Sequence, residues 1–173
     1  MHRSPSIQRH SNIRSLRGQQ GVVAIEFALV FLFGVLPLLL LTFSGVMIFA
    51  AQQTLTLAAA EGARAALHYG TTAQRATNAC NAAQASMQWL LTFSGDATNC
   101  ATPSAPSTTS YSAIAVSTPS ACPSTPAMEC VTVVASYNYN AHPFFPGTEA
   151  IYGWVMGAVM RSSATVQLDL TGD

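Results

Sequence analysis

A glycine and a carboxylate, five residues apart, are the residues of this sequence whose spacing points most clearly to chemistry. Gly21 precedes four apolar residues, and Glu26 and Phe27 follow at the start of a long apolar run. A carboxylate at the edge of a bilayer-spanning helix is costly without a partner, so Glu26 is a functional candidate. Its best partner is the α-amino group that cleavage after Gly21 would create on Val22. The simpler alternative is a Glu26 side chain that reaches to the membrane surface.

The apolar run itself predicts a helix that crosses a membrane. No charged residue occurs from Phe27 to Ala51, a stretch of 25 residues, and about 20 suffice to span a bilayer. A cleaved secretory signal has an apolar core of only about 7–15 residues, so a conventional signal peptide is the weaker reading. Pro37 lies in the middle of the run and predicts a helix kink there.

The charges predict how this helix is oriented. Four of the seven arginines, Arg3, Arg9, Arg14 and Arg17, precede Gly21, and no acidic residue accompanies them. The positive-inside rule then places the N-terminus in the cytoplasm and the rest of the chain outside it. After Gly21 three arginines face seven acidic residues, so the processed chain carries about −4. This charge argues against nucleic acid as a partner.

Four cysteines lie on the predicted outer side, at Cys80, Cys100, Cys122 and Cys130. They form no C-x-x-C pair, and no histidine stands at zinc-finger spacing from them, so no metal site is expected. An even number of cysteines in an oxidising compartment predicts two disulfides. Pairing of sequence neighbours, Cys80 with Cys100 and Cys122 with Cys130, is the preferred one of three connectivities, all of which the sequence leaves open.

The patterns along the chain predict an α+β protein: a long transmembrane helix extends outward into a small disulfide-stapled domain with about three antiparallel strands. Helix formers continue past the apolar run to about Tyr69, which gives roughly 70 Å of helix. A shorter helix is expected from Thr71 to about Leu91. The strands are expected at residues 111–117, 130–139 and 164–170, with a turn at 142–147 and a short helix at 148–159. The predicted divisions are 1–21, a basic leader; 22–69, the long helix; 70–110, a short helix and a Ser/Thr/Pro-rich loop; and 111–173, the outer domain.

No motif of the sequence predicts catalysis. His68 and His142 are the only histidines after the leader, and neither belongs to a nucleophile or metal pattern. Glycine-rich phosphate loops are missing as well. We therefore expect no enzyme activity, no cofactor and no small-molecule substrate.

Several segments together resemble the TadE-like family, the minor pilins or pseudopilins of the tight-adherence (Flp) pilus system. They are Gln20 to Val30, Leu36 to Leu39 and Ala60-Glu61-Gly62-Ala63-Arg64, with a weaker likeness from 155 to 164 and none in the Ser/Thr/Pro-rich middle. The resemblance implies cleavage between Gly21 and Val22 by a prepilin peptidase. It also implies a minor role in building an adhesive pilus, for adhesion or biofilm formation.

The partners that this resemblance implies are the peptidase, other pilins or pseudopilins, and the inner-membrane assembly platform. The expected location is the inner membrane, as a single-pass protein that is cytoplasmic at its N-terminus and periplasmic or extracellular beyond the span. Two other functions stay open: a type II secretion pseudopilin, and an uncleaved, signal-anchored periplasmic interaction domain.

Overall fold

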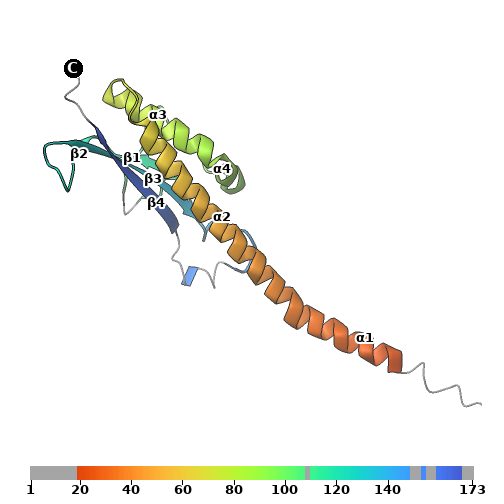
Figure 1. Cartoon of the computed structure of the whole chain (residues 1–173). Coiled ribbons are helices and arrows are strands. Elements are labelled where there is room, and N and C mark those ends of the chain that lie inside the picture. The colour runs from red at the N-terminus through yellow and green to blue at the C-terminus, as the bar shows by residue number, and fades with distance from the viewer. Residues whose placement is uncertain (1–18, 108–109, 149–152, 155–158, 169–173) are drawn as a thin grey trace, which may run out of the picture. The chain divides into compact units, whose positions relative to one another are not determined.

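The computed structural model describes residues 19–107, 110–148, 153–154 and 159–168 (Figure 1). The chain divides into two compact units, Met1–Phe43 and Ser44–Asp173. Most of the predicted leader and most of the predicted helix at 148–159 lie outside the described residues.

The first unit is helical throughout its described part. Helix α1 covers Gln19–Val30, a π-helical turn η1 covers Phe31–Val35, and α2 covers Leu36–Ala65, which continues into the second unit. The predicted long helix is therefore present, although it begins before Val22 and ends four residues short of Tyr69.

The π-helical turn lies directly before Pro37. There the Leu36 N–H donates to the carbonyl of Phe31, five residues back. Proline has no N–H, and its ring crowds the carbonyl four residues before it, so a wider turn at this point relieves that crowding. A kink at Pro37 itself stays a prediction.

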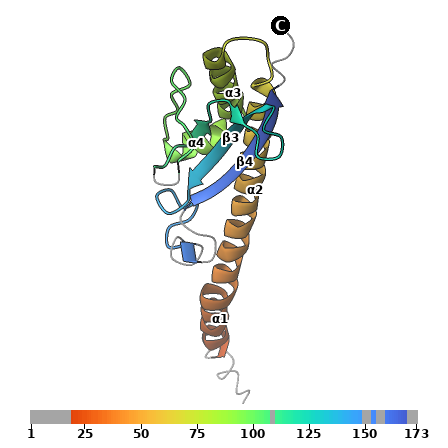
Figure 2. The same cartoon turned by 90° about the vertical axis from the view of Figure 1, so that its left-hand side faces the viewer.

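The second unit is an antiparallel sheet with helices on one face (Figure 2). Its helices are the outer part of α2, α3 (Thr72–Ser86) and α4 (Gln88–Ser94). Strand β3 (Glu129–Asn138) is central, and β4 (Val159–Leu168) pairs with it along its full length. Strands β1 (Ile114–Val116) and β2 (Ser120–Ala121) pair one after the other with the opposite edge of β3. The predicted α+β class is confirmed, with four strands instead of about three.

Alternation along β3 decides which side chains meet the helices. Val131, Val133, Ala135 and Tyr137 belong to the core with the buried faces of all three helices. On the opposite side of the sheet, the Thr132 and Thr165 hydroxyls of β3 and β4 hydrogen-bond at 2.9 Å. This inside–outside alternation has the period of two that a half-buried sheet requires.

The structure departs from the predicted elements at three places. The helix expected to run from Thr71 to about Leu91 is broken at Met87, whose side chain fills the core (0% exposed). Strand β2 was not expected, because two residues are too short to show a period. Strand β4 begins at Val159, five residues before the expected Ala164, since pairing with β3 extends it beyond its clearest alternation.

Small residues on α2 are buried inside its own unit. Ala58, Ala59, Gly62 and Ala63 are buried, and so is Ala66 directly after the end of α2. Small side chains let helices approach closely. The structure shows packing against the chain's own domain.

Gly62 marks the closest approach, and we expect Gly62→Ala to destabilise the second unit. An added Cβ would lie 2.9 Å from Val133 Cγ1 and 3.0 Å from the backbone oxygen of Ala79. Overpacking of this kind costs about 1–3 kcal/mol, which outweighs the roughly 1 kcal/mol that alanine gains over glycine in a helix. Denaturant unfolding of the full chain in detergent should show a lower midpoint. Gly34→Ala, where a Cβ meets no atom within 4 Å, is the matched control, and an unchanged midpoint in Gly62→Ala would contradict this packing.

Candidate processing and assembly site

The segment from Gly21 to Phe27 is an exposed stretch of α1. Val22 is 65% and Phe27 71% exposed, and a Cβ built on Gly21 meets no atom within 4 Å. Nothing in the chain's own fold therefore requires a glycine at position 21. The apolar side chains around it are those of a segment that meets lipid or other helices rather than water.

The Gly21–Val22 bond lies in helical backbone, because α1 begins at Gln19. A protease that reads an extended backbone must first unwind this turn. This turn contains glycine, the weakest helix former after proline, so local unwinding is inexpensive at this bond.

Glu26 is exposed and lies one helical turn after Val22. Residues four apart stand on the same helix face, so the amine that cleavage would create lies on the same side as the carboxylate. Among the residues that the structure describes, Glu26 has no ion pair or hydrogen bond, and the single ion pair found there joins Glu61 and Arg64. The structure thus leaves Glu26 free for a partner from outside its own unit.

The helical stretch Gly21–Ala65 is long and apolar enough to cross a membrane, and it is the only such helix in the described part of the chain. The Thr42 hydroxyl of this helix donates to the Leu38 carbonyl at 2.6 Å, so its hydrogen bond is made within the helix. By length and composition the helix is compatible with a single-pass membrane anchor.

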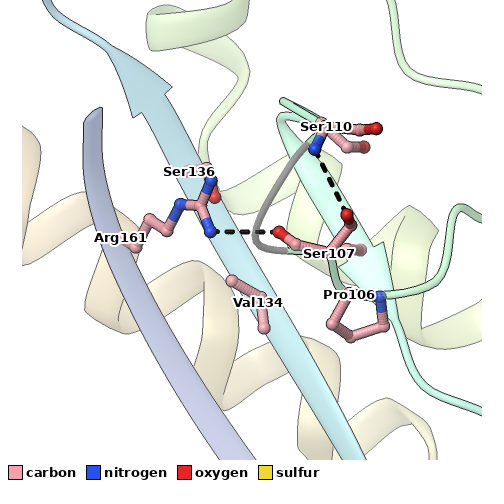
Figure 3. A pocket seen from close by; sticks show the side chains of 8 residues that line it. Pro106, Ser107, Ser110, Val134, Ser136 and Arg161 are labelled. Atoms are coloured by element: carbon pink, nitrogen blue, oxygen red, sulfur yellow. Dashed lines mark hydrogen bonds between the residues drawn. The ribbon is translucent and has the colours of Figure 1, made fainter. Parts of the chain in front are cut away.

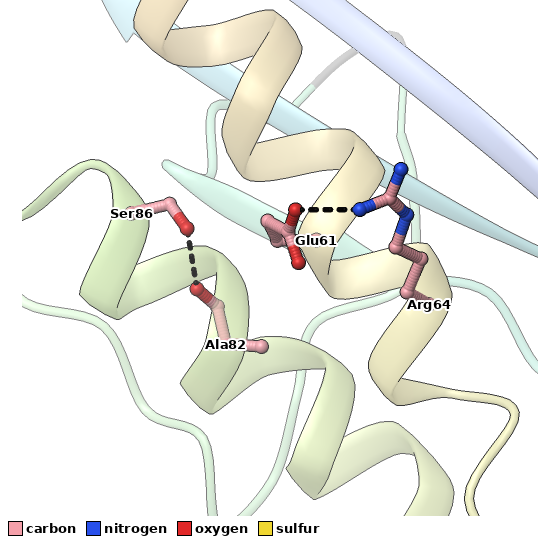
Figure 4. Close-up of polar contacts among 4 residues, drawn as sticks. All are labelled: Glu61, Arg64, Ala82 and Ser86. Carbon is pink, nitrogen blue, oxygen red and sulfur yellow. Dashed lines mark hydrogen bonds and ion pairs between the residues drawn. The ribbon is translucent and has the colours of Figure 1, made fainter.

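The Ala60–Arg64 block lies on α2, and some of its side chains face the core while others face the surface. Figure 4 shows the exposed side: Arg64 Nη1 donates to Glu61 Oε1 at 3.0 Å, beside α3, where Ser86 Oγ donates to the Ala82 carbonyl at 3.0 Å. Glu61 and Arg64 stand three residues apart on one helix face, and in water their ion pair contributes a few tenths of a kcal/mol. Gly62 and Ala63 face the core, so the main structural role of this block is helix packing.

Both disulfides follow the preferred pairing. Cys80–Cys100 ties α3 to the loop after α4, and Cys122–Cys130 closes the turn between β2 and β3. Loops of these lengths correspond to about 3 kcal/mol of stabilisation each in the chain-entropy account. All four cysteines are in disulfides, so none has a free thiolate that could bind a metal.

A small cavity on the outer face of the sheet brings together residues that the sequence did not single out (Figure 3). It measures about 170 Å³, and Arg161 of β4 lies at its wall with Nη1 donating to the Ser107 carbonyl at 3.1 Å. Ser110, Ser112 and Ser136 also line it. A serine needs an adjacent base to become a nucleophile, and none of the described lining residues is a histidine or a carboxylate.

Near this cavity, Tyr111 donates to Asp96 Oδ2 at 2.7 Å. Burial, and then the hydrogen bond to Asp96, raise the pKa of Tyr111 well above its ordinary value. Tyr111 therefore stays a neutral donor at all physiological pH values. A tyrosine and an aspartate 15 residues apart carry no signal in the sequence, and only the fold brings them together.

Aromatic rings gather around the predicted turn at 142–147, which the structure confirms as a turn. The Phe144 ring lies 5.2–6.2 Å from four other rings, those of Trp89, Phe93, Tyr137 and Tyr139. Burial raises the pKa of Tyr137 well above its ordinary value, and its hydroxyl donates to the His142 carbonyl. The sequence indicated the turn but not that one phenylalanine would join α4 to the end of β3.

Comparison with known proteins supports the resemblance seen in the sequence. The family model described as "TadE-like protein" matches residues 21–64, which contain Gly21, Glu26, Pro37 and the whole Ala60–Arg64 block. No curated protein and no solved structure matches the chain. TadE-like proteins are structural components associated with the Tad pilus system. The match covers the long helix from Gly21 to Arg64, and over that stretch it supports a TadE-like protein associated with the Tad/Flp pilus system.

Proposed function

We propose that the chain is a minor pseudopilin that takes part in assembling a Tad/Flp-type surface pilus and so serves adhesion or biofilm formation. In this proposal a prepilin peptidase cuts between Gly21 and Val22 on the cytoplasmic side of the inner membrane. The helix then anchors the processed subunit, and the second unit lies in the periplasm. The role is structural, without an active site.

The observation that carries this proposal is the free carboxylate of Glu26 on a fully exposed apolar helix that matches the TadE-like model. An unpaired charge among apolar side chains is costly, whereas the same charge beside an amine of opposite sign recovers much of that cost. Cleavage supplies such an amine on Val22, and association of subunits brings one chain's amine near the next chain's carboxylate.

The partners in this proposal are the peptidase, other pilins or pseudopilins, and the assembly platform of the inner membrane. In this proposal the peptidase reads the turn of α1 that contains Gly21 and Val22, and the other subunits pack along the exposed apolar helix. The exposure of every residue from Gly21 to Phe43 supports packing by helix–helix contact, since none of this surface is used by the chain's own fold.

The experiment is the intact mass of the protein from membranes of piliated cells, combined with recovery of its partners. We expect a chain that begins at Val22, lacks Met1–Gly21, contains two disulfides and co-purifies with the major pilin. An intact Met1 terminus would instead identify an uncleaved anchored domain. A processed chain recovered with type II secretion components would identify a pseudopilin of that system.

A further inference from the structure

Arg161 of β4 borders the cavity on the outer face of the sheet, and its charge has no acidic partner among the described residues (Figure 3). The single ion pair found there joins Glu61 and Arg64. The hydrogen bond from Arg161 Nη1 to the Ser107 carbonyl, at 3.1 Å, uses one of the five N–H donors of the guanidinium. In the described part of the chain, the other four donors of this planar group are left for a further acceptor.

The strand register explains the floor of the cavity. Ala115 of β1 lies opposite Val134 of β3, and Ser136 of β3 lies opposite Arg161 of β4. Side chains alternate between the two faces of a strand, and the residues on either side of Val134 face the core. Val134 and Ser136 therefore face outward, so the floor combines an apolar part with a hydroxyl next to the guanidinium.

The Ser136 hydroxyl also has no hydrogen-bond partner among the residues that the structure describes. Ser136 is only 3% exposed, and it lines the cavity. Its backbone N–H donates to the Ala113 carbonyl at 2.8 Å, which fixes its position in the sheet. A buried hydroxyl normally has a partner, so this one is placed to bond to a group inside the cavity.

The loop before β1 forms the opposite wall of the cavity. It is fixed to the sheet where the Val116 N–H donates to the Ser104 carbonyl at 2.8 Å. Within the loop, the Ser110 N–H donates to Ser107 Oγ at 3.2 Å. These contacts need no ligand, so the cavity exists before anything binds in it. The residues of this loop that line it are Pro106, Ser107, Ser110 and Ser112.

The cavity has room for a small organic group. It measures about 170 Å³, and an engineered cavity of about 150 Å³ holds benzene. Phosphate sites draw on helix N-termini, backbone N–H nests or several cations, whereas Arg161 is the only cation in this lining. A guanidinium matches the planar geometry of a carboxylate, and the apolar floor suits a short aliphatic part.

We propose that this cavity binds a carboxylate group, which the Arg161 guanidinium and the Ser136 hydroxyl hold, with its aliphatic part against Val134 and Ala115. The proposal goes beyond the proposed pilus role and does not depend on it, because every residue of the cavity belongs to the second unit. A small organic acid and the carboxylate of another protein chain present the same chemistry to this site.

The test is a titration of the full chain in a zwitterionic detergent with sodium propionate, followed by NMR of ¹⁵N-labelled arginine side chains. The Arg161 Nε–H signal is the one that disappears in Arg161→Lys. We expect this signal to shift saturably, with a Kd on the order of a few millimolar. Equal concentrations of sodium chloride or of the neutral analogue propionamide should shift it little.

Two variants assign the binding to the proposed groups. Arg161→Gln, followed through the Ser136 backbone amide, should bind propionate at least about tenfold more weakly, because a charge-assisted hydrogen bond is lost. Ser136→Ala, followed through Arg161, should bind about fivefold more weakly. Arg64→Gln is the matched control, since Arg64 pairs with Glu61 and does not line the cavity, and its affinity should equal that of the wild type.

Ser136→Ala also separates a ligand group from a structural one. It keeps the hydrogen bond between Arg161 and Ser107 and removes a hydroxyl that has no described partner. The denaturation midpoint should therefore not fall although binding weakens. If Arg161→Gln fails to fold, Ser136→Ala still decides the outcome: wild-type affinity in this variant would exclude the hydroxyl and overturn the proposal.

A second titration identifies the source of the carboxylate. A short peptide with a free C-terminal carboxylate is compared with the same peptide as its C-terminal amide. Binding of the free form alone supports a protein chain as the source, and binding of propionate but of neither peptide supports a small organic acid.

Three other results would show that the proposal is wrong. A shift that does not saturate, or one that sodium chloride reproduces, would leave Arg161 with only the task of fixing the loop to the sheet. An equal response to propionamide would mean that the site does not recognise the charge. Tighter binding of inorganic phosphate than of propionate would replace the carboxylate by a different anion.

Discussion

Gly21→Leu is expected to leave the chain uncleaved at the membrane without disturbing its fold. A Cβ at position 21 meets no atom of the described residues within 4 Å, so we expect any loss to arise in the peptidase. A branched side chain forced into a tight site costs about 1–3 kcal/mol, which corresponds to roughly 5- to 150-fold slower cleavage. The measurement is the ratio of full-length to processed chain after a pulse of synthesis, resolved by mass spectrometry.

Two variants make this result specific to the scissile bond. Gly21→Ala adds the smallest side chain and should fall between wild type and Gly21→Leu. Gly34→Leu adds the same leucine where the chain also has open space, and it should be processed normally. Equal cleavage of wild type and Gly21→Leu would mean that no peptidase reads this position.

Glu26→Gln and Glu26→Ala are expected to abolish assembly while membrane insertion and cleavage persist. Insertion does not suffer, because neutral residues cost less than a carboxylate in a membrane helix. Assembly suffers because the amine on Val22 of a neighbouring chain loses its partner. Leaving one member of a buried ion pair alone costs about 3–5 kcal/mol, so association with other pilins should weaken by at least about a hundredfold.

The second acid of the same helical stretch provides the matched control. Glu61 is partly exposed and already pairs with Arg64, so Glu61→Gln should change stability by a few tenths of a kcal/mol and leave piliation intact. Membrane fractionation, cleavage and co-purification with the major pilin are measured for all three variants. Normal pili in both Glu26 variants would reduce Glu26 to a residue that reaches to the membrane surface.

The helix and the disulfide pairing were predictable from local signals, whereas the layout of the second unit was only partly so. A charge-free run and an alanine-rich continuation are local features of one helix, and they predicted the two ends of that helix to within a few residues. Cysteines separated by 20 and 8 residues pair as neighbours, the arrangement preferred from the sequence. The break at Met87 depends on the room available in the core, and no local pattern encodes that room.

The remaining site features escaped prediction because they are made by tertiary contacts. Tyr111 meets Asp96, and Phe144 meets Trp89, only once the sheet and helices are in place. Gly62 belongs to the Ala60–Arg64 block that resembles the TadE-like family, but its proximity to Val133 of β3 could not be read from the sequence. The roles of Gly21, Glu26 and Pro37 remain predictions, because they concern a protease, neighbouring subunits and a bend in the helix.

The order of the cysteines bears on how the chain matures during export. Cys80 bonds to the next cysteine along the chain, and Cys122 does the same, so the two covalent loops neither cross nor nest. When the part of the chain beyond the span crosses the membrane in sequence order, Cys80 and Cys100 both reach the oxidising compartment before Cys122 appears. Simple oxidation in order of arrival then yields the native bonds, and maturation of this subunit should need a thiol oxidase but no enzyme that reshuffles disulfides.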